Sequence, residues 1–162
     1  MSKPKFKPGT VIAYFDASHA HYLYTLRSVS DNIIFLNKTP LQSYCKRQGM
    51  VERSTYGSEI ISWRSCTEIG MDLRCRQRII CATIHGPSLV YRDNISVIVK
   101  LFLLSIILEK KPNDIPYYKV WEAVTAVVLC IYHVSIQMNI SDLITNPLGP
   151  INHYPLMIKF TV

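Results

Sequence analysis

The stretch Val11-Ile12-Ala13-Tyr14-Phe15-Asp16 (VIAYFD) begins the part of the chain that decides the fold. It is short, apolar and rich in β-branched and aromatic side chains, so it predicts a strand with an aspartate at its C-terminal end. Two further strand-like runs, Asn32–Asn37 and Leu41–Arg47, follow in succession. Pro40 begins the third run, where a missing N–H is tolerated. Because antiparallel strands can be joined by short turns, the three runs favour an antiparallel meander.

The rest of the chain alternates helices and strands. Ser54–Ile80 has apolar side chains near helical spacing and starts with two candidate N-cap residues, Ser54 and Thr55. Beyond it we expect a strand at Leu89–Asp93, a helix at Asn94–Leu108, a helix at Tyr117–Ala126, a strand at Val127–Ser135 and a short helix at Asn139–Ile144. This order predicts an α/β fold: a mixed five-stranded sheet, with its first three strands antiparallel, flanked by helices.

Length and composition are those of one globular domain. The chain has 162 residues, of which 49% are hydrophobic and 18% charged, which argues against disorder along its length. We expect a basic N-terminal extension at 1–10, the folded domain at 11–149, and an irregular C-terminal tail at 150–162 because that end is rich in proline.

Targeting signals and cysteine usage set an expected compartment. No apolar stretch approaches the ~20 residues that span a bilayer, and the N-terminus MSKPKFKPGT lacks the apolar region of a secretory signal. The 5 cysteines include no Cys-x-x-Cys pair, which argues against a disulfide framework and a zinc ribbon. We therefore expect an intracellular protein, cytoplasmic or nuclear, that is not secreted and has no membrane partner.

Four acidic residues occupy similar places in the expected elements. Asp16 and Asp93 end strands, Glu59 lies in the first turns of the long helix, and Asp142 lies in the first turn of the last helix. Strand ends and helix starts can meet at one edge of a sheet. Clustered carboxylates repel one another unless a cation neutralises them, and Mg²⁺ prefers such oxygen ligands. Each acid taken alone is better explained as a solvated carboxylate or a helix cap, and the joint placement of four strengthens the case for a metal-dependent nuclease without deciding it.

Positive charge is concentrated in the first third of the chain. Residues 1–53 contain 8 Lys and Arg against 3 Asp and Glu, whereas the remaining segments 54–93 and 94–162 each carry a balance of +1. This excess suits a polyanion partner, although it is also compatible with an ordinary basic surface. The candidates for contact with backbone phosphates are Lys38, Lys46, Arg47 and Arg53.

Several short stretches carry a family resemblance. They are DA at 16–17, FLNKTP at 35–40 with Tyr44 and KRQ at 46–48, VERSTYGSE at 51–59, MDLR at 71–74, YRDN at 91–94 with SV at 96–97, and NISDLIT at 139–145. Together they resemble the ribonuclease H domain at the end of copia-type retrotransposon polyproteins, from about Val11 to Gly149. The resemblance implies a ribonuclease H-like fold and cleavage of RNA in an RNA–DNA hybrid. It also implies two Mg²⁺ or Mn²⁺ ions held by Asp16, Glu59, Asp93 and Asp142, with no small-molecule cofactor.

The chain also departs from that family. Residues 99–118 lack the polar, His- and Arg-containing character of the family segment, and the Pro-Ala before the last acid is replaced by Ile140-Ser141. The chain contains no Tyr-x-Asp-Asp pair of a polymerase, so it resembles a stand-alone, partly degenerate fragment. The alternatives are an inactive ribonuclease H-like fragment that retains nucleic-acid binding, a non-catalytic binding module, and a dimer interface or non-folding product arising from the apolar segment 97–108.

Overall fold

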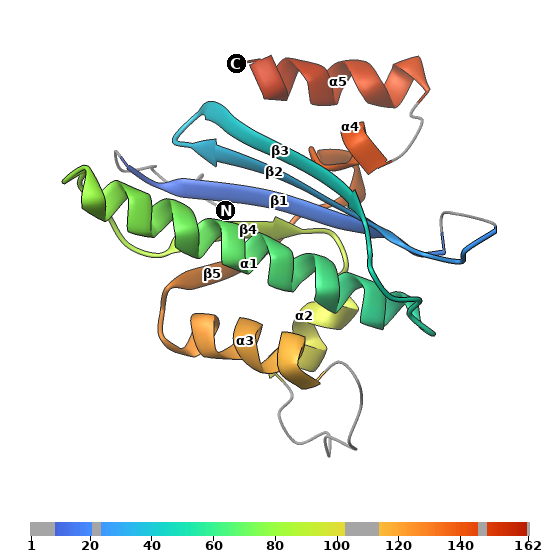
Figure 1. Ribbon diagram of the computed structural model, residues 1–162. Coiled ribbons are helices and arrows are strands. Elements are labelled where there is room, and N and C mark those ends of the chain that lie inside the picture. Colours follow the sequence, from blue (N-terminus) through green and yellow to red (C-terminus); the bar gives the residue numbers. More distant parts are fainter. Residues whose placement is uncertain (1–8, 21–23, 103–113, 146–148, 162) are drawn as a thin grey trace.

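The structure is built around a five-stranded sheet in the order β3-β2-β1-β4-β5. The computed structural model describes residues 9–20, 24–102, 114–145 and 149–161 (Figure 1). The strands are β1 (Val11–Ser18), β2 (Val29–Leu36), β3 (Thr39–Arg47), β4 (Ser88–Arg92) and β5 (Leu129–His133). The pairs β1–β2 and β2–β3 are antiparallel, whereas β1–β4 and β4–β5 are parallel. The predicted mixed sheet with an antiparallel start is confirmed.

A tight turn at Asn37 joins β2 to β3. Asn37 adopts a φ of 59°, a left-handed conformation that asparagine tolerates better than most residues. Its backbone N–H donates to the carbonyl of Thr10 at 2.7 Å, and its side-chain Oδ1 accepts from the Thr10 N–H at 3.2 Å. Pro40 lies in β3, the edge strand, opposite an irregularity between Ile34 and Phe35. An edge position and a register shift both accommodate a residue that cannot donate a ladder hydrogen bond.

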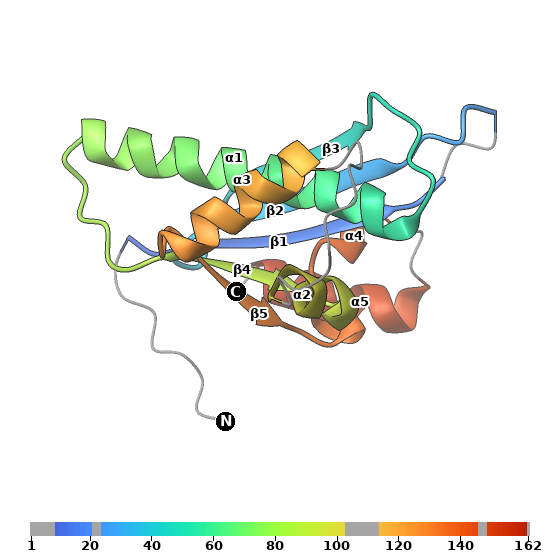
Figure 2. The ribbon, with the colours of Figure 1, turned by 90° about the horizontal axis from the view of Figure 1, so that it is seen from below.

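One face of the sheet is covered by α1 (Thr55–Ile79) and α3 (Asp114–Thr125) (Figures 1 and 2). Ser54 is the N-cap of α1, since its hydroxyl accepts from the Gly57 N–H at 3.1 Å. The larger core cluster lies between this helix layer and the sheet. Its fully buried members include Phe15 from β1, Trp63 from α1 and Val120 from α3. The sheet and the helix that follows the meander are therefore held together by one apolar core.

The opposite face carries the C-terminal elements η1 (Ile136–Met138), α4 (Asp142–Thr145) and α5 (Pro150–Thr161) (Figure 1). The predicted last helix, Asn139–Ile144, is seen as α4 and begins at Asp142, three residues later than expected. The predicted helix 94–108 is seen as α2 (Ile95–Phe102), and its remainder lies outside the described residues, as do 1–8 of the N-terminal extension. Within the described ranges, no helix has both the length and the apolar character needed to cross a membrane.

The expectation of an irregular tail at 150–162 is wrong, because α5 occupies most of it. Pro150 stands at the first helical position, where its missing N–H has no intrahelical acceptor to lose. The Gly149 carbonyl accepts from the N–H groups of Asn152 and His153, both at 3.0 Å. Leu156 is 2% exposed and belongs to a second core cluster on this face. Leu156 therefore packs α5 against the sheet although Pro155 cannot donate a helical hydrogen bond, and α5 is part of the folded unit.

Candidate metal centre

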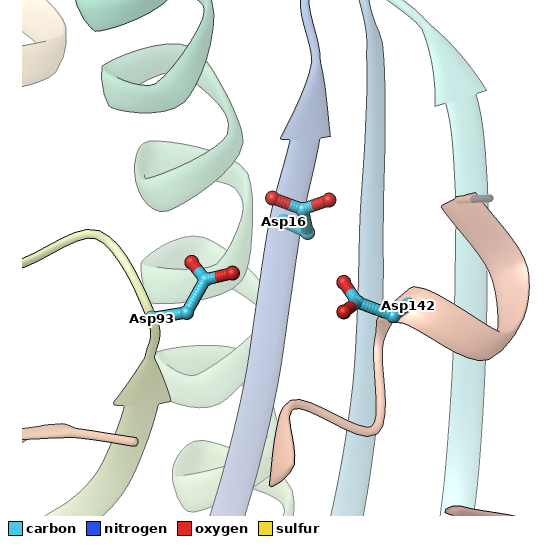
Figure 3. A group of neighbouring side chains, drawn as sticks. All are labelled: Asp16, Asp93 and Asp142. Atoms are coloured by element: carbon cyan, nitrogen blue, oxygen red, sulfur yellow. The ribbon is translucent and has the colours of Figure 1, made fainter. Parts of the chain in front are cut away.

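Three aspartates converge at the C-terminal ends of the central parallel strands. Asp16 lies in β1, Asp93 directly follows β4, and Asp142 is the first residue of α4. Each offers a carboxylate oxygen, and these oxygens all lie within 4.8 Å of one another. Figure 3 shows the three side chains pointing toward a common space. The sequence prediction that distant acids meet at one edge of the sheet is confirmed for these three.

Strand alternation sets the direction of Asp16. Ile12 belongs to the second core cluster and Tyr14 packs against it, whereas Phe15 lies in the larger cluster on the α1 side. Even-numbered residues of β1 therefore face α4, and Asp16 continues that series. From α1, the Ser62 hydroxyl donates to the Asp16 carbonyl at 2.7 Å, which fixes the backbone at this point.

Asn139 ties the segment before α4 to the sheet. Its Nδ2 donates to the carbonyl of Phe15, the neighbour of Asp16, at 3.5 Å. Its Oδ1 accepts from the Ser141 hydroxyl at 2.7 Å, and both side chains are completely buried. These contacts place Asp142, one residue further along, opposite Asp16. Asp142 also borders a pocket of about 350 Å³ that lies between η1 and α5.

The electrostatics of the centre favour a bound cation. Burial, together with the smaller effect of the carboxylates of Asp16 and Asp93, raises the pKa of Asp142 to about 7. A carboxyl group in this position is stabilised in its ionised form by a nearby positive charge. Three carboxylate oxygens are a donor set suited to a hard divalent ion such as Mg²⁺ or Mn²⁺. The residues at this centre therefore fit the metal that the sequence resemblance implies.

Glu59 lies apart from the three aspartates. It is buried in α1, but it is not a member of the metal-competent group among the described residues. Its Oε2 forms an ion pair with Arg92, and its Oε1 accepts from the Asn94 side-chain amide at 2.8 Å. Its predicted role as a metal ligand stays a prediction.

Two residues near the centre were missed by sequence reasoning. Arg92 is 3% exposed and stands immediately before Asp93. The sequence gives one indication of this position: Arg92 lies two residues after Val90 in β4, so its charged side chain points to the same core-facing side. Asp31 is completely buried and pairs with Asp16 across β1 and β2, so both lie on the same face of the sheet. Only the strand register, which the sequence does not fix, reveals that pairing.

The predicted phosphate-contacting residues are all exposed but do not form one group. Lys46 and Arg47 are the last residues of β3 and pair with Ser30 and Val29 of β2. Because Asp16 pairs with Asp31, Lys46 lies one residue and Arg47 two residues beyond Asp16 along the sheet. Two strand spacings separate them from β1, which is about 10 Å. Arg53 precedes α1 at the same end of the sheet, whereas Lys38 lies at its other end in the β2–β3 turn. Lys46, Arg47 and Arg53 are thus the better placed candidates, and their role stays a prediction.

Comparison with known proteins identifies the fold. No family model matches the chain, and no significant match is found among curated proteins. Among solved structures, it is similar to RNase H1 from the halophilic archaeon Halobacterium salinarum, with a TM-score of 0.59, 14% identity, and coverage of 82% of this chain and 91% of that one. It is also similar to LC11-RNase H1 in complex with an RNA/DNA hybrid, with a TM-score of 0.56, 15% identity, and coverage of 80% and 88%.

A viral enzyme gives the same result. The foamy viral protease-reverse transcriptase in complex with an RNA/DNA hybrid matches with a TM-score of 0.62 and 12% identity over 95% of this chain and 22% of that one. The five-stranded sheet with its flanking helices is therefore the ribonuclease H fold. At this level of identity, the likeness establishes the fold, and the chemistry has to be argued from the residues of the site.

Proposed function

We propose that this chain is a metal-dependent ribonuclease that hydrolyses the RNA strand of RNA–DNA hybrids and derives from a copia-type retrotransposon. The observation that carries the proposal is the convergence of Asp16, Asp93 and Asp142 in a ribonuclease H fold. Two structural neighbours contain an RNA/DNA hybrid, which supports the choice of substrate. The copia-type origin rests on the sequence stretches at 35–59, 91–94 and 139–145.

The acidic and the basic residues near the centre have different roles in this proposal. Asp16, Asp93 and Asp142 would hold Mg²⁺ or Mn²⁺, and such an ion would keep Asp142, whose pKa is raised to about 7, in its ionised form. Such an ion supplies an activated water and stabilises the leaving oxygen in phosphodiester hydrolysis. The sequence resemblance adds Glu59 and a second ion to this scheme. Lys46, Arg47 and Arg53 would neutralise phosphates of the hybrid backbone on the β3 side.

Cleavage of a labelled RNA–DNA hybrid by purified protein tests the proposal. We expect Mg²⁺ or Mn²⁺ to be required, EDTA to stop the reaction, and only the RNA strand of the hybrid to be cut. Single-strand RNA, duplex RNA and duplex DNA serve as substrate controls. The Asp93→Asn variant keeps the size of the side chain and removes its charge, so it separates true activity from contaminating nuclease. Equal cleavage by the wild type and this variant would show that the proposed catalysis is wrong.

A non-catalytic module that binds hybrids is the second candidate. It is favoured by the ion pair between Glu59 and Arg92, which engages one acid of the expected catalytic set. Such a module would bind the hybrid with a steep dependence on salt, because phosphate neutralisation releases counterions, and binding would persist in EDTA. Fluorescence anisotropy with a labelled hybrid, at several salt concentrations, measures both properties. Loss of all binding when the metal is removed would contradict this candidate.

A further inference from the structure

Arg92 and Glu59 form a buried ion pair beside the three aspartates. The two side chains are 3% and 7% exposed, and the pair joins Arg92 Nη2 to Glu59 Oε2. The other carboxylate oxygen of Glu59 accepts from the Asn94 amide at 2.8 Å. Both oxygens of Glu59 are therefore engaged by groups of the protein itself.

Aromatic packing fixes the position of the guanidinium. The Arg92 Cζ lies 5.0 Å from the centroid of the Phe15 ring and 5.4 Å from that of the Trp63 ring. Both rings are completely buried in the larger core cluster. A planar guanidinium held over aromatic faces gains from cation–π attraction and is not free to swing into solvent. Arg92 therefore cannot leave this position without disturbing the core.

The guanidinium also interacts with the metal centre. An arginine guanidinium is not deprotonated in proteins, and that of Arg92 interacts electrostatically with the carboxylates of Asp93 and Asp16. The group therefore remains positively charged at neutral pH and acts on two of the three candidate metal ligands. A second divalent ion held by Glu59 would have to break the ion pair and bind next to a fixed positive charge in a poorly solvated site.

We propose that the Arg92 guanidinium takes the place of a second metal ion on the Glu59 side, so that this centre binds one divalent cation through Asp16, Asp93 and Asp142. This inference rests on the metal site of the proposed function and departs from the two ions implied by the sequence resemblance. Glu59 then acts as a positioning residue: it holds Arg92 in place, and Asn94 holds Glu59. The positive charge that a second ion would supply is provided permanently by the chain.

Mn²⁺ binding to the purified, metal-free protein tests the inference without measuring activity. Free Mn²⁺ is counted by electron paramagnetic resonance during a titration, and the bound spectrum reports whether two ions lie close enough to couple. We expect one ion per wild-type chain with an uncoupled spectrum. Arg92→Met removes the charge but keeps a long apolar side chain, and we expect it to bind two ions with the coupled signal of a pair about 4 Å apart.

Two matched variants make the result specific. Arg92→Lys retains a positive charge, so we expect one ion as in the wild type. Adding Glu59→Gln to Arg92→Met removes the ligand for the second ion, so we expect the double variant to return to one. A coupled pair of ions in the wild type would overturn the inference, and this result does not depend on any variant folding. One ion in a folded Arg92→Met protein, shown by an unchanged circular dichroism spectrum, would also overturn it.

The outcome is separable from the outcome of the cleavage assay. If the wild type binds one Mn²⁺, Arg92→Met binds two, and neither cuts an RNA–DNA hybrid, then the inference holds and the proposed function is wrong. If the wild type cuts the hybrid and binds a coupled pair of ions, then the proposed function holds and the inference is wrong.

Discussion

Replacing Asp142 by asparagine should stabilise the metal-free protein at neutral and alkaline pH. Asp142 has a carboxylate oxygen within 4.8 Å of one from Asp16 and one from Asp93. Coulomb's law gives about 3.5 kcal/mol of repulsion for two unit charges at that separation and an effective dielectric constant of about 20. Asp16 and Asp93 are only half-buried, so solvent screening reduces the combined effect, and we expect a net gain of about 1–3 kcal/mol.

The stability gained by the Asp142→Asn replacement should depend on pH, and the raised pKa of Asp142 determines the direction of this dependence. That pKa is about 7 in the folded protein, against about 3.9 for an unperturbed aspartate. The folded state therefore binds the proton more tightly than the unfolded state, and the wild type loses stability as the pH rises from about 4 to about 7. Asparagine does not titrate. The difference between the variant and the wild type should be small near pH 4, grow through this interval and stay constant above it.

Thermal unfolding followed by circular dichroism in EDTA measures the effect. For a chain of this size, 1 kcal/mol corresponds to about 2–4 °C, so we expect the melting temperature of Asp142→Asn to exceed that of the wild type by about 3–10 °C at pH 8. Saturating Mg²⁺ should then raise the melting temperature of the wild type only. The corresponding gain in the free energy of unfolding reaches about 2.7 kcal/mol when the Mg²⁺ concentration is one hundred times the dissociation constant. Asp72→Asn is the matched control, because Asp72 forms an exposed i,i+4 pair with Arg76 and should change stability little at any pH.

Two outcomes would refute this reasoning about the centre. One is a melting temperature for Asp142→Asn that is lower than that of the wild type at pH 8 in EDTA. The other is a Mg²⁺-induced stabilisation as large in the variant as in the wild type. Either would mean that the three carboxylates do not share a charge-repelling, cation-binding space.

Three further predictions concern the centre and the fold. The apparent Mn²⁺ affinity of the wild type should rise from pH 5 to about 7 and then level off, because Asp142 must ionise to bind the ion. Binding should therefore release a proton. Calorimetry in buffers of different ionisation enthalpy measures both the affinity and the number of protons released. Ser54→Ala removes the cap that accepts from the Gly57 N–H, so the free energy of unfolding should fall by about 1 kcal/mol in urea titrations. Leu156→Ala should cost about 2–5 kcal/mol in the same assay, whereas Ile151→Ala, at a position 88% exposed on α5, should cost under about 0.5 kcal/mol.

Sequence reasoning succeeded where local patterns determine local structure. β-branched and aromatic runs identified the strands, and Asp16 and Asp93 were recognised because each stands at the end of such a run. Ser54 was recognised as an N-cap candidate from its residue type. These features depend on neighbours in the sequence, and the order of elements was enough to predict the mixed sheet.

The errors and omissions arise where distant segments pack against each other. The prolines of the C-terminal segment indicated irregular structure, yet burial of Leu156 against the sheet supports a helix there. The pairing of Glu59 with Arg92 requires α1 to lie across the end of β4, which no spacing reveals. Asp31 faces Asp16 only because of the register between β1 and β2. Each of these contacts joins residues fifteen or more positions apart, and a pattern in one segment carries no information about the other.

The adjacent residues Arg92 and Asp93, at the end of β4, point to opposite sides of the sheet. Val90 and Arg92 face α1, where the guanidinium meets Glu59 and the rings of the core. Asp93, the next residue, turns toward Asp16 and Asp142 (Figure 3). Because successive side chains of a strand point to opposite faces, the last residue of β4 and the residue that follows it supply a buried cation and a candidate metal ligand on opposite sides. A slip of β4 by one residue would exchange them and place a guanidinium among the aspartates. The parallel register of β4 with β1 is therefore the feature on which both the carboxylate cluster and the positive charge beside it depend.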